Sequence, residues 1–164
     1  MLIEGRPNSN LFHFSFPISL LLILVCRARK VLARGVPTVT ILFGSETGTA
    51  ECYAKQLGNV LEQLKPTIAT LNDAATEEGR KLLLNDVVLI ITSTFGAGSA
   101  PFNALNFLAP TSPKLPNLVS LNTNQPVKLA VCAIGSSVYP DFCAYGRTVW
   151  FTLKEAGIVE YKIR

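Results

Sequence analysis

Three apolar runs that each end at a glycine-bearing polar loop constrain the fold of this chain most. They span residues 38–43, 87–92 and 127–134. A continuous apolar run is typical of a strand that is buried on both faces of a parallel sheet. Amphipathic segments over 50–64 and 141–156 lie between or after these runs and favour helices. The alternation predicts an α/β fold, with helices on both faces of the sheet.

Shorter segments complete the predicted chain order. Thr67–Leu71 is expected to form a short strand, and residues 72–84 a helix that Asn72 or Asp73 caps. A short helix is expected near 102–108, followed by a proline-rich connection over 109–126. Gly157 is predicted to end the last helix, before a fifth strand at 158–163.

The length and the charge distribution exclude some classes of protein. A chain of 164 residues is expected to form one domain with a sizeable core. Its net charge of +4 lies entirely in residues 1–37, and residues 38–164 carry equal numbers of basic and acidic groups. The sequence therefore contains no basic footprint for nucleic acid.

The histidine and cysteine content excludes further chemistry. His13 is the only histidine, so Ser-His-Asp and Cys-His catalysis find no support in residues 38–164. The four cysteines have no CxxC spacing, which argues against a zinc site and a disulfide framework. We expect no metal site, and we expect Cys132 and Trp150 to belong to the core.

The N-terminal segment, residues 1–37, carries an apolar run of its own. Residues 11–26 contain no formal charge, and basic residues follow directly at 27–34. One interpretation is a membrane anchor, whose basic flank would keep the following domain in the cytoplasm. The other is an additional apolar segment that packs on the protein, or a stretch that is not translated in the true product. The sequence leaves these interpretations open.

The loop after the first apolar run has the composition of a phosphate site. Ser45, Thr47 and Thr49 supply hydroxyls, and the next helix begins with N–H groups that have no partner within it. Neither Lys nor Arg occurs between Pro37 and Lys55, unlike in a nucleoside-triphosphate loop, and the dinucleotide fingerprint GxGxxG is missing. The pattern favours a single terminal phosphate. An ordinary turn rich in small hydroxyl residues is the alternative.

The loops after the three runs should lie together. In a parallel α/β sheet, ligands bind at the carboxyl ends of the strands. These loops cover 44–49, 93–100 and 135–142, and the second and third carry Phe95 and Tyr139. A hydroxyl cradle with two aromatic rings suits a planar heterocycle that is joined to one phosphate, which is the shape of FMN. Packing of the two rings at the rim of the core is the alternative for the aromatics.

Residues 38–157 resemble the flavodoxin-like FMN domain of diflavin reductases. GSETGTAE resembles the phosphate loop of that family, TSTFGAGSAP its first ring-binding loop, and GSSVYPDFCAYG its second. The combination of STFGxG with GSxxYPxFCA is most similar to the FMN domain of nitric oxide synthases. The resemblance implies a three-layer α/β sandwich around a parallel five-stranded sheet of order 2-1-3-4-5.

The resemblance also implies the residues that bind FMN. Phe95 and Tyr139 would pack on opposite faces of the flavin ring. No amino acid would act as a catalytic acid or base. The phosphate is expected at Ser45, Glu46, Thr47, Gly48 and Thr49, and the ring at Ser93, Thr94, Phe95, Gly96, Gly98, Gly135, Tyr139 and Phe142.

Two departures from the family pattern change the expectation. The family has an acidic residue where this chain has Ser99, and neither Asp nor Glu occurs from Val87 to Pro140. Less negative charge beside the ring should raise the reduction potential above the usual range of the family. Arg164 also precedes the acidic loop and the final helix of the family's domain. We therefore expect a C-terminally truncated domain over 38–164, with one sheet face left bare and a lowered FMN affinity.

The leading hypothesis is an FMN-binding electron-transfer module. It would relay electrons between a separate flavin reductase and an acceptor such as a haem protein, without a complete catalytic cycle of its own. The alternative is a truncated, flavin-free isoform that acts through interaction or as a dominant negative. An enzyme acting on a phosphosugar is the weakest hypothesis, because Asp141 is the only carboxylate near the second and third loops.

Overall fold

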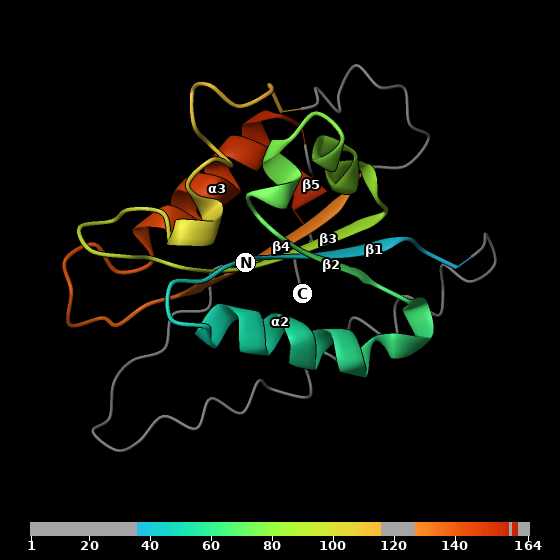
Figure 1. Cartoon of the computed structure of the whole chain (residues 1–164), viewed down its shortest axis with the longest axis horizontal. Helices are drawn as coiled ribbons and strands as arrows, with labels where there is room; N and C mark the ends of the chain where they lie inside the picture. Colours follow the sequence, from blue (N-terminus) through green and yellow to red (C-terminus); the bar gives the residue numbers. More distant parts are fainter. Residues whose placement is uncertain (1–35, 116–126, 158, 161–164) are drawn as a thin grey trace.

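One parallel sheet organises the molecule. The computed structural model describes residues 36–115, 127–157 and 159–160. Its five strands lie in the order β2-β1-β3-β4-β5, and every neighbouring pair is parallel (Figure 1). The predicted sheet order is therefore confirmed. The strands are β1 (Val39–Gly44), β2 (Thr67–Thr70), β3 (Val87–Ser93), β4 (Lys128–Ile134) and β5 (Val159–Glu160).

Helices cover both faces of the sheet. The α-helix α2 (Thr49–Val60) lies on one face, and α3 (Ala144–Glu155) lies on the other together with the short helices of the β2–β3 connection (Figure 1). The molecule thus has the three layers that the alternation of strands and helices predicts. The 3-10 helices are η2 (Glu62–Leu64), η3 (Asp73–Ala75), η4 (Gly79–Leu84) and η5 (Phe102–Ala104).

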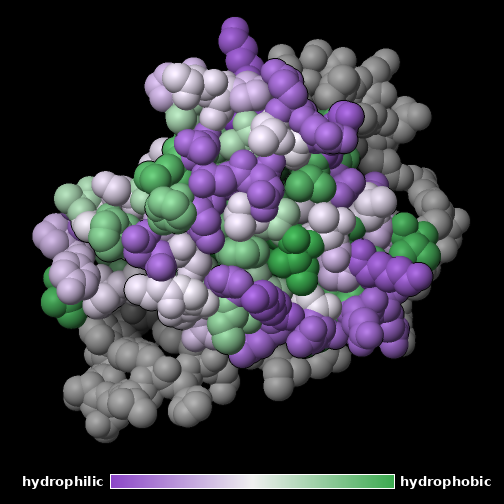
Figure 2. All heavy atoms as spheres, viewed as in Figure 1, coloured by the Kyte–Doolittle hydropathy of each residue, from purple (hydrophilic) through white to green (hydrophobic). Residues whose placement is uncertain are grey.

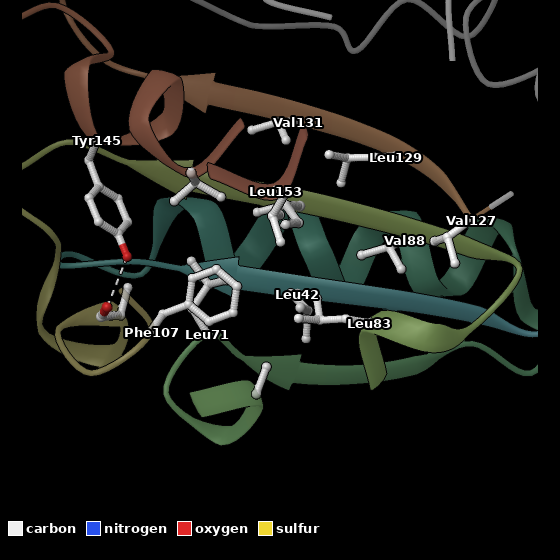
Figure 3. Packing of buried hydrophobic residues seen from close by; sticks show 14 residues of the cluster. Leu42, Leu71, Leu83, Val88, Phe107, Val127, Leu129, Val131, Tyr145 and Leu153 are labelled. Atoms are coloured by element: carbon white, nitrogen blue, oxygen red, sulfur yellow. Dashed lines mark hydrogen bonds between the residues drawn. The ribbon is translucent and has the colours of Figure 1, made fainter. Parts of the chain in front are cut away.

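Alternating side chains of each central strand feed two separate cores. In β1, Ile41 and Phe43 pack under α2, whereas Leu42 packs on the opposite face with Leu71 and Leu83. Figure 3 shows this second core, which α3 closes. Burial on both faces explains why these strands contain few polar residues, since neither face contacts water.

Close contact between α3 and β4 depends on a glycine. A Cβ atom placed on Gly146 would lie 2.4 Å from the Cβ of Ala133, far inside van der Waals contact. The missing side chain lets the helix backbone approach the sheet. Val149 and Leu153, farther along the same helix, are then fully buried in the second core.

The predicted helix over 72–84 is wrong, because the chain forms η3 and η4 with a break between them. The carboxylate of Asp73 accepts hydrogen bonds from the N–H and the hydroxyl of Thr70, at 2.8 and 2.7 Å, and thus faces back toward β2. Gly79 approaches the carbonyl of Asp73 so closely that any Cβ would clash, and its N–H donates to the hydroxyl of Thr76. These local bonds compete with a continuous helix.

Two further helices are shorter than predicted. The segment near 102–108 forms η5 over three residues and continues as turns. The helix expected from Asp141 begins at Ala144, because Cys143 has a left-handed backbone with φ of 56°. A residue in that conformation cannot lie within a right-handed helix.

The α2 face of the sheet is less covered over β4. There Ala130, Cys132 and Ile134 are only half-buried, although they pack against the first core. Trp150 is also half-buried and packs against the second core, as expected for a core residue. On the face that Figure 2 presents, hydrophobic residues form separate patches among polar ones.

Several predicted features lie outside the described residues. These are the apolar segment 11–26 and most of the strand expected at 158–163, of which Val159–Glu160 is described. In the ranges that the structure describes, none of the helices has the length and apolarity needed to cross a membrane.

Candidate cofactor site

The three predicted loops leave the sheet side by side. Gly44 at the end of β1 pairs with Thr92, and Ser93 at the end of β3 pairs with Ile134. The Ser93 hydroxyl donates to the carbonyl of Gly44 at 3.4 Å, and the N–H of Thr94 donates to the carbonyl of Ile134 at 3.2 Å. The expectation that these loops meet at the carboxyl edge is thus confirmed.

Ser45 shapes the first loop from within. Its side chain is buried, and its Oγ accepts hydrogen bonds from the N–H groups of Gly48 and Ala50, at 3.0 and 3.2 Å. Gly48 precedes α2 with φ of 90°, a conformation that favours glycine. Ser45 therefore caps the helix across this glycine, and only its hydroxyl hydrogen remains to donate to a ligand.

The rest of this loop offers donors to a ligand. Among the described residues, no acceptor lies in hydrogen-bond geometry with the N–H groups of Glu46, Thr47 and Thr49. The hydroxyls of Thr47 and Thr49 lie 3.4 Å apart on the surface. Free N–H groups, two hydroxyls and a helix N-terminus form a donor set that fits a phosphate.

The side chain of Glu46 binds to η5. Its Oε2 accepts a 2.7 Å hydrogen bond from the N–H of Phe102, which precedes Asn103 in η5. The side chain of Asn103 in turn accepts a 2.6 Å hydrogen bond from the N–H of Ser45. Sequence reasoning missed Asn103, since it lies outside the three loop motifs.

The second loop is a closed, compact turn. The N–H of Phe95 donates to the carbonyl of Ser99 at 3.0 Å, and the reverse bond measures 2.8 Å. Both glycines inside it, Gly96 and Gly98, have positive φ angles. The hydroxyl of Thr94 accepts the N–H of Tyr145, which ties the loop to the first turn of α3. The aromatic ring of Phe95 is half-exposed.

The third loop lies against the second. A Cβ on Gly98 would lie 3.5 Å from the Cβ of Asp141, so the two loops are in contact. Asp141 thus places a carboxylate near the ring loop that itself lacks one. Phe142 is half-buried beside Gly135, whereas Tyr139 is exposed.

The structure therefore gathers the predicted residues at one edge and divides their roles. The hydroxyls of Ser45, Ser93 and Thr94 are engaged in holding the loops. The threonine hydroxyls of the first loop and the rings of the other two loops remain accessible. An edge with a phosphate-shaped donor set and exposed aromatic rings is typical of a nucleotide-binding α/β protein.

Comparison with known proteins identifies the family. The family model for flavodoxin matches residues 41–160, so the chain belongs to the flavodoxin family. A single-residue variant of flavodoxin from Pseudomonas aeruginosa superposes with a TM-score of 0.55 at 26% identity, over 75% of this chain and 78% of that one. Flavodoxin 2 from Bacillus cereus gives a TM-score of 0.55 at 22% identity, over 77% of this chain and 80% of the other, and supports the fold.

Two relatives confirm the resemblance to diflavin reductases. Mouse inducible nitric oxide synthase is 30% identical over 155 residues, which cover 93% of this chain and 12% of that protein. The sulfite reductase [NADPH] flavoprotein alpha-component of Bacillus subtilis is 34% identical over 125 residues, covering 73% of this chain and 19% of the relative. The chain thus spans less than a fifth of the length of either relative.

Proposed function

We propose that this chain binds FMN at the carboxyl edge of its sheet and carries electrons between other redox proteins. The observation that carries the proposal is the phosphate-shaped donor set of the first loop beside two accessible aromatic rings. Membership of the flavodoxin family and similarity to a reductase flavoprotein support the same cofactor.

The residues of the chain would bind and orient the cofactor. The N–H groups of Glu46, Thr47 and Thr49 would hold the phosphate, with the threonine hydroxyls. Phe95 and Tyr139 would pack against the ring, since both side chains are more than half-exposed, at 51% and 66%. Bound FMN supplies the electron-transfer chemistry, so no amino acid has to act as an acid or a base.

The proposed partners are a flavin reductase that donates electrons and a redox protein, such as a haem protein, that accepts them. The similarity to one flavoprotein component and to nitric oxide synthases supports this choice. Anaerobic mixing of the reduced holoprotein with oxidised cytochrome c tests the transfer of electrons to an acceptor. Reduction of the haem at a rate that depends on the holoprotein concentration is expected, and no reduction above that by free FMN would contradict it.

A spectrum tests the cofactor. The full chain is purified without added flavin, equilibrated with FMN, freed of excess flavin and examined by visible absorption and flavin fluorescence. We expect a structured flavin band and quenched fluorescence. A folded protein that remains colourless at micromolar FMN would contradict the proposal and favour a flavin-free interaction partner.

Variants test the position of the ring. Phe95→Ala and Tyr139→Ala should each raise the Kd for FMN roughly tenfold, because each removes an aromatic contact and buried apolar area. Phe151→Ala is the matched control, since Phe151 is a similarly exposed aromatic residue on α3. Equal affinities for all three variants and the wild type would place the ring elsewhere.

A further inference from the structure

We propose that Asn103 is a positioning residue for the phosphate loop, an inference that rests on the proposed function. Its Oδ1 atom accepts the N–H of Ser45 at 2.6 Å, across 58 residues of sequence. The contact joins η5 to the first residue after β1. Asn103 would act on the cofactor through Ser45, without a contact of its own.

A second bond runs between the same two segments with the roles exchanged. The N–H of Phe102 donates to the carboxylate of Glu46 at 2.7 Å. Each segment thus supplies one side-chain acceptor and one backbone donor. Two such bonds between consecutive residue pairs fix both the distance and the orientation of the segments, which a single bond would not.

The segment that carries Asn103 is also held by hydrogen bonds from residues between β2 and β3. Asn72, which follows β2, donates its N–H to the carbonyl of Asn103 at 2.9 Å and its side-chain amide to the carbonyl of Phe102 at 3.2 Å. Its Oδ1 accepts the N–H of Asn106 at 2.8 Å. The buried Arg80 donates to the carbonyl of Phe107 at 2.9 Å. Asn103 is therefore a fixed point against which the loop is held.

Ser45 transmits this constraint to the phosphate donors. With its N–H held by Asn103, its Oγ accepts the N–H groups of Gly48 and Ala50. The loop is bent around this hydroxyl, and the N–H groups between, of Glu46 and Thr47, keep no acceptor among the described residues. Loss of the Asn103 bond should let Ser45 rotate and disperse these donors.

Two readouts of Asn103→Ala test the inference. The first is the Kd for FMN compared with that for riboflavin, which lacks the phosphate. We expect roughly tenfold weaker FMN binding, as for loss of one part-buried hydrogen bond, and little change for riboflavin. The second is amide hydrogen exchange at Ser45 in the apoprotein, which should accelerate in the variant.

Asn106→Ala is the matched control. Asn106 lies in the same segment, and the hydrogen bonds of its N–H and carbonyl there are kept when the side chain is replaced. Equal weakening of FMN and riboflavin, or unchanged exchange at Ser45, would overturn the inference. A wild-type chain that binds no FMN would overturn the proposed function, while faster exchange at Ser45 in the variant would still support the role of Asn103 in the loop. If Asn103→Ala does not fold, Asn103→Ser gives the same two readouts, because the serine side chain is too short for its hydroxyl to reach the N–H of Ser45.

Discussion

The hydroxyl of Tyr145 donates a 2.9 Å hydrogen bond to the main-chain carbonyl of Ala104, inside the second core (Figure 3). The bond connects α3 to η5, the short helix that carries Asn103. Burial raises the pKa of Tyr145 well above its usual range, so the hydroxyl stays protonated and remains a donor. The helix after β4 is thereby joined to the segment that binds the N–H of Ser45.

We expect Tyr145→Phe to lower the free energy of unfolding by about 1 kcal/mol, because the buried carbonyl of Ala104 loses its donor. Urea unfolding followed by circular dichroism measures the change. The aromatic packing is retained in this variant, so a larger loss would point to a change beyond the hydrogen bond. An unchanged midpoint would show that the bond contributes nothing to stability.

Gly146→Ala should be more damaging than an alanine in a helix normally is. The added methyl would meet the Cβ of Ala133 at 2.4 Å, so α3 must move away from β4. Overpacking of this kind costs about 1–3 kcal/mol. The double variant with Ala133→Gly removes the clashing atom and should recover part of the loss. A single variant as stable as the wild type would mean that the helix shifts without cost.

Stability should fall at alkaline pH through Cys132. Burial, with a smaller contribution from Cys143, raises its pKa from 9.0 to about 11. Because the folded state holds this proton more tightly than the unfolded state, stability is retained below about pH 9 and is lost as the pH rises toward about 11. Urea midpoints across this range should fall less steeply in Cys132→Ala than in the wild type. Parallel profiles would contradict the prediction.

An acidic residue in the ring loop should lower the reduction potential of bound FMN. Ser99→Asp adds a negative charge to the loop closed by Phe95 and Ser99, which disfavours the addition of electrons. The expected shift is of order tens of millivolts, since ~30 mV corresponds to ~1.4 kcal/mol for two electrons. Gln63→Glu, which adds the same charge in exposed η2, is the control. A redox titration that gives equal potentials would show that this position does not affect the ring.

Much of the sheet and its edge could be predicted from short stretches of sequence. The runs around Ile41 and Ile90 are continuous because both faces of their strands are buried, so local composition reports the environment directly. The glycines and hydroxyl residues that follow each run mark the loops, because turns and helix N-termini also depend on residues that are close together in the chain. Parallel strands then bring those loops together.

The failed helix over 72–84 shows where local pattern is insufficient. Its possible capping residues and its leucines at 82–84 are compatible with a helix, but the bonds of Asp73 with Thr70 and of Gly79 with Thr76 break it into two turns. From the sequence alone, Asp73 is a suitable residue to cap a helix. Its actual partner depends on how β2 ends, which only the folded chain specifies.

The sequence by itself determined the sheet, the positions of its loops and the family, because these follow from residue types that are close together in the chain. Only the tertiary structure decided that Ser45 shapes the loop while the N–H groups of Glu46 and Thr47 remain for a ligand. It also joined Asn103 to the loop after β1, because a hydrogen bond across 58 residues depends on the packing of η5 against β1 and leaves no local pattern in the sequence.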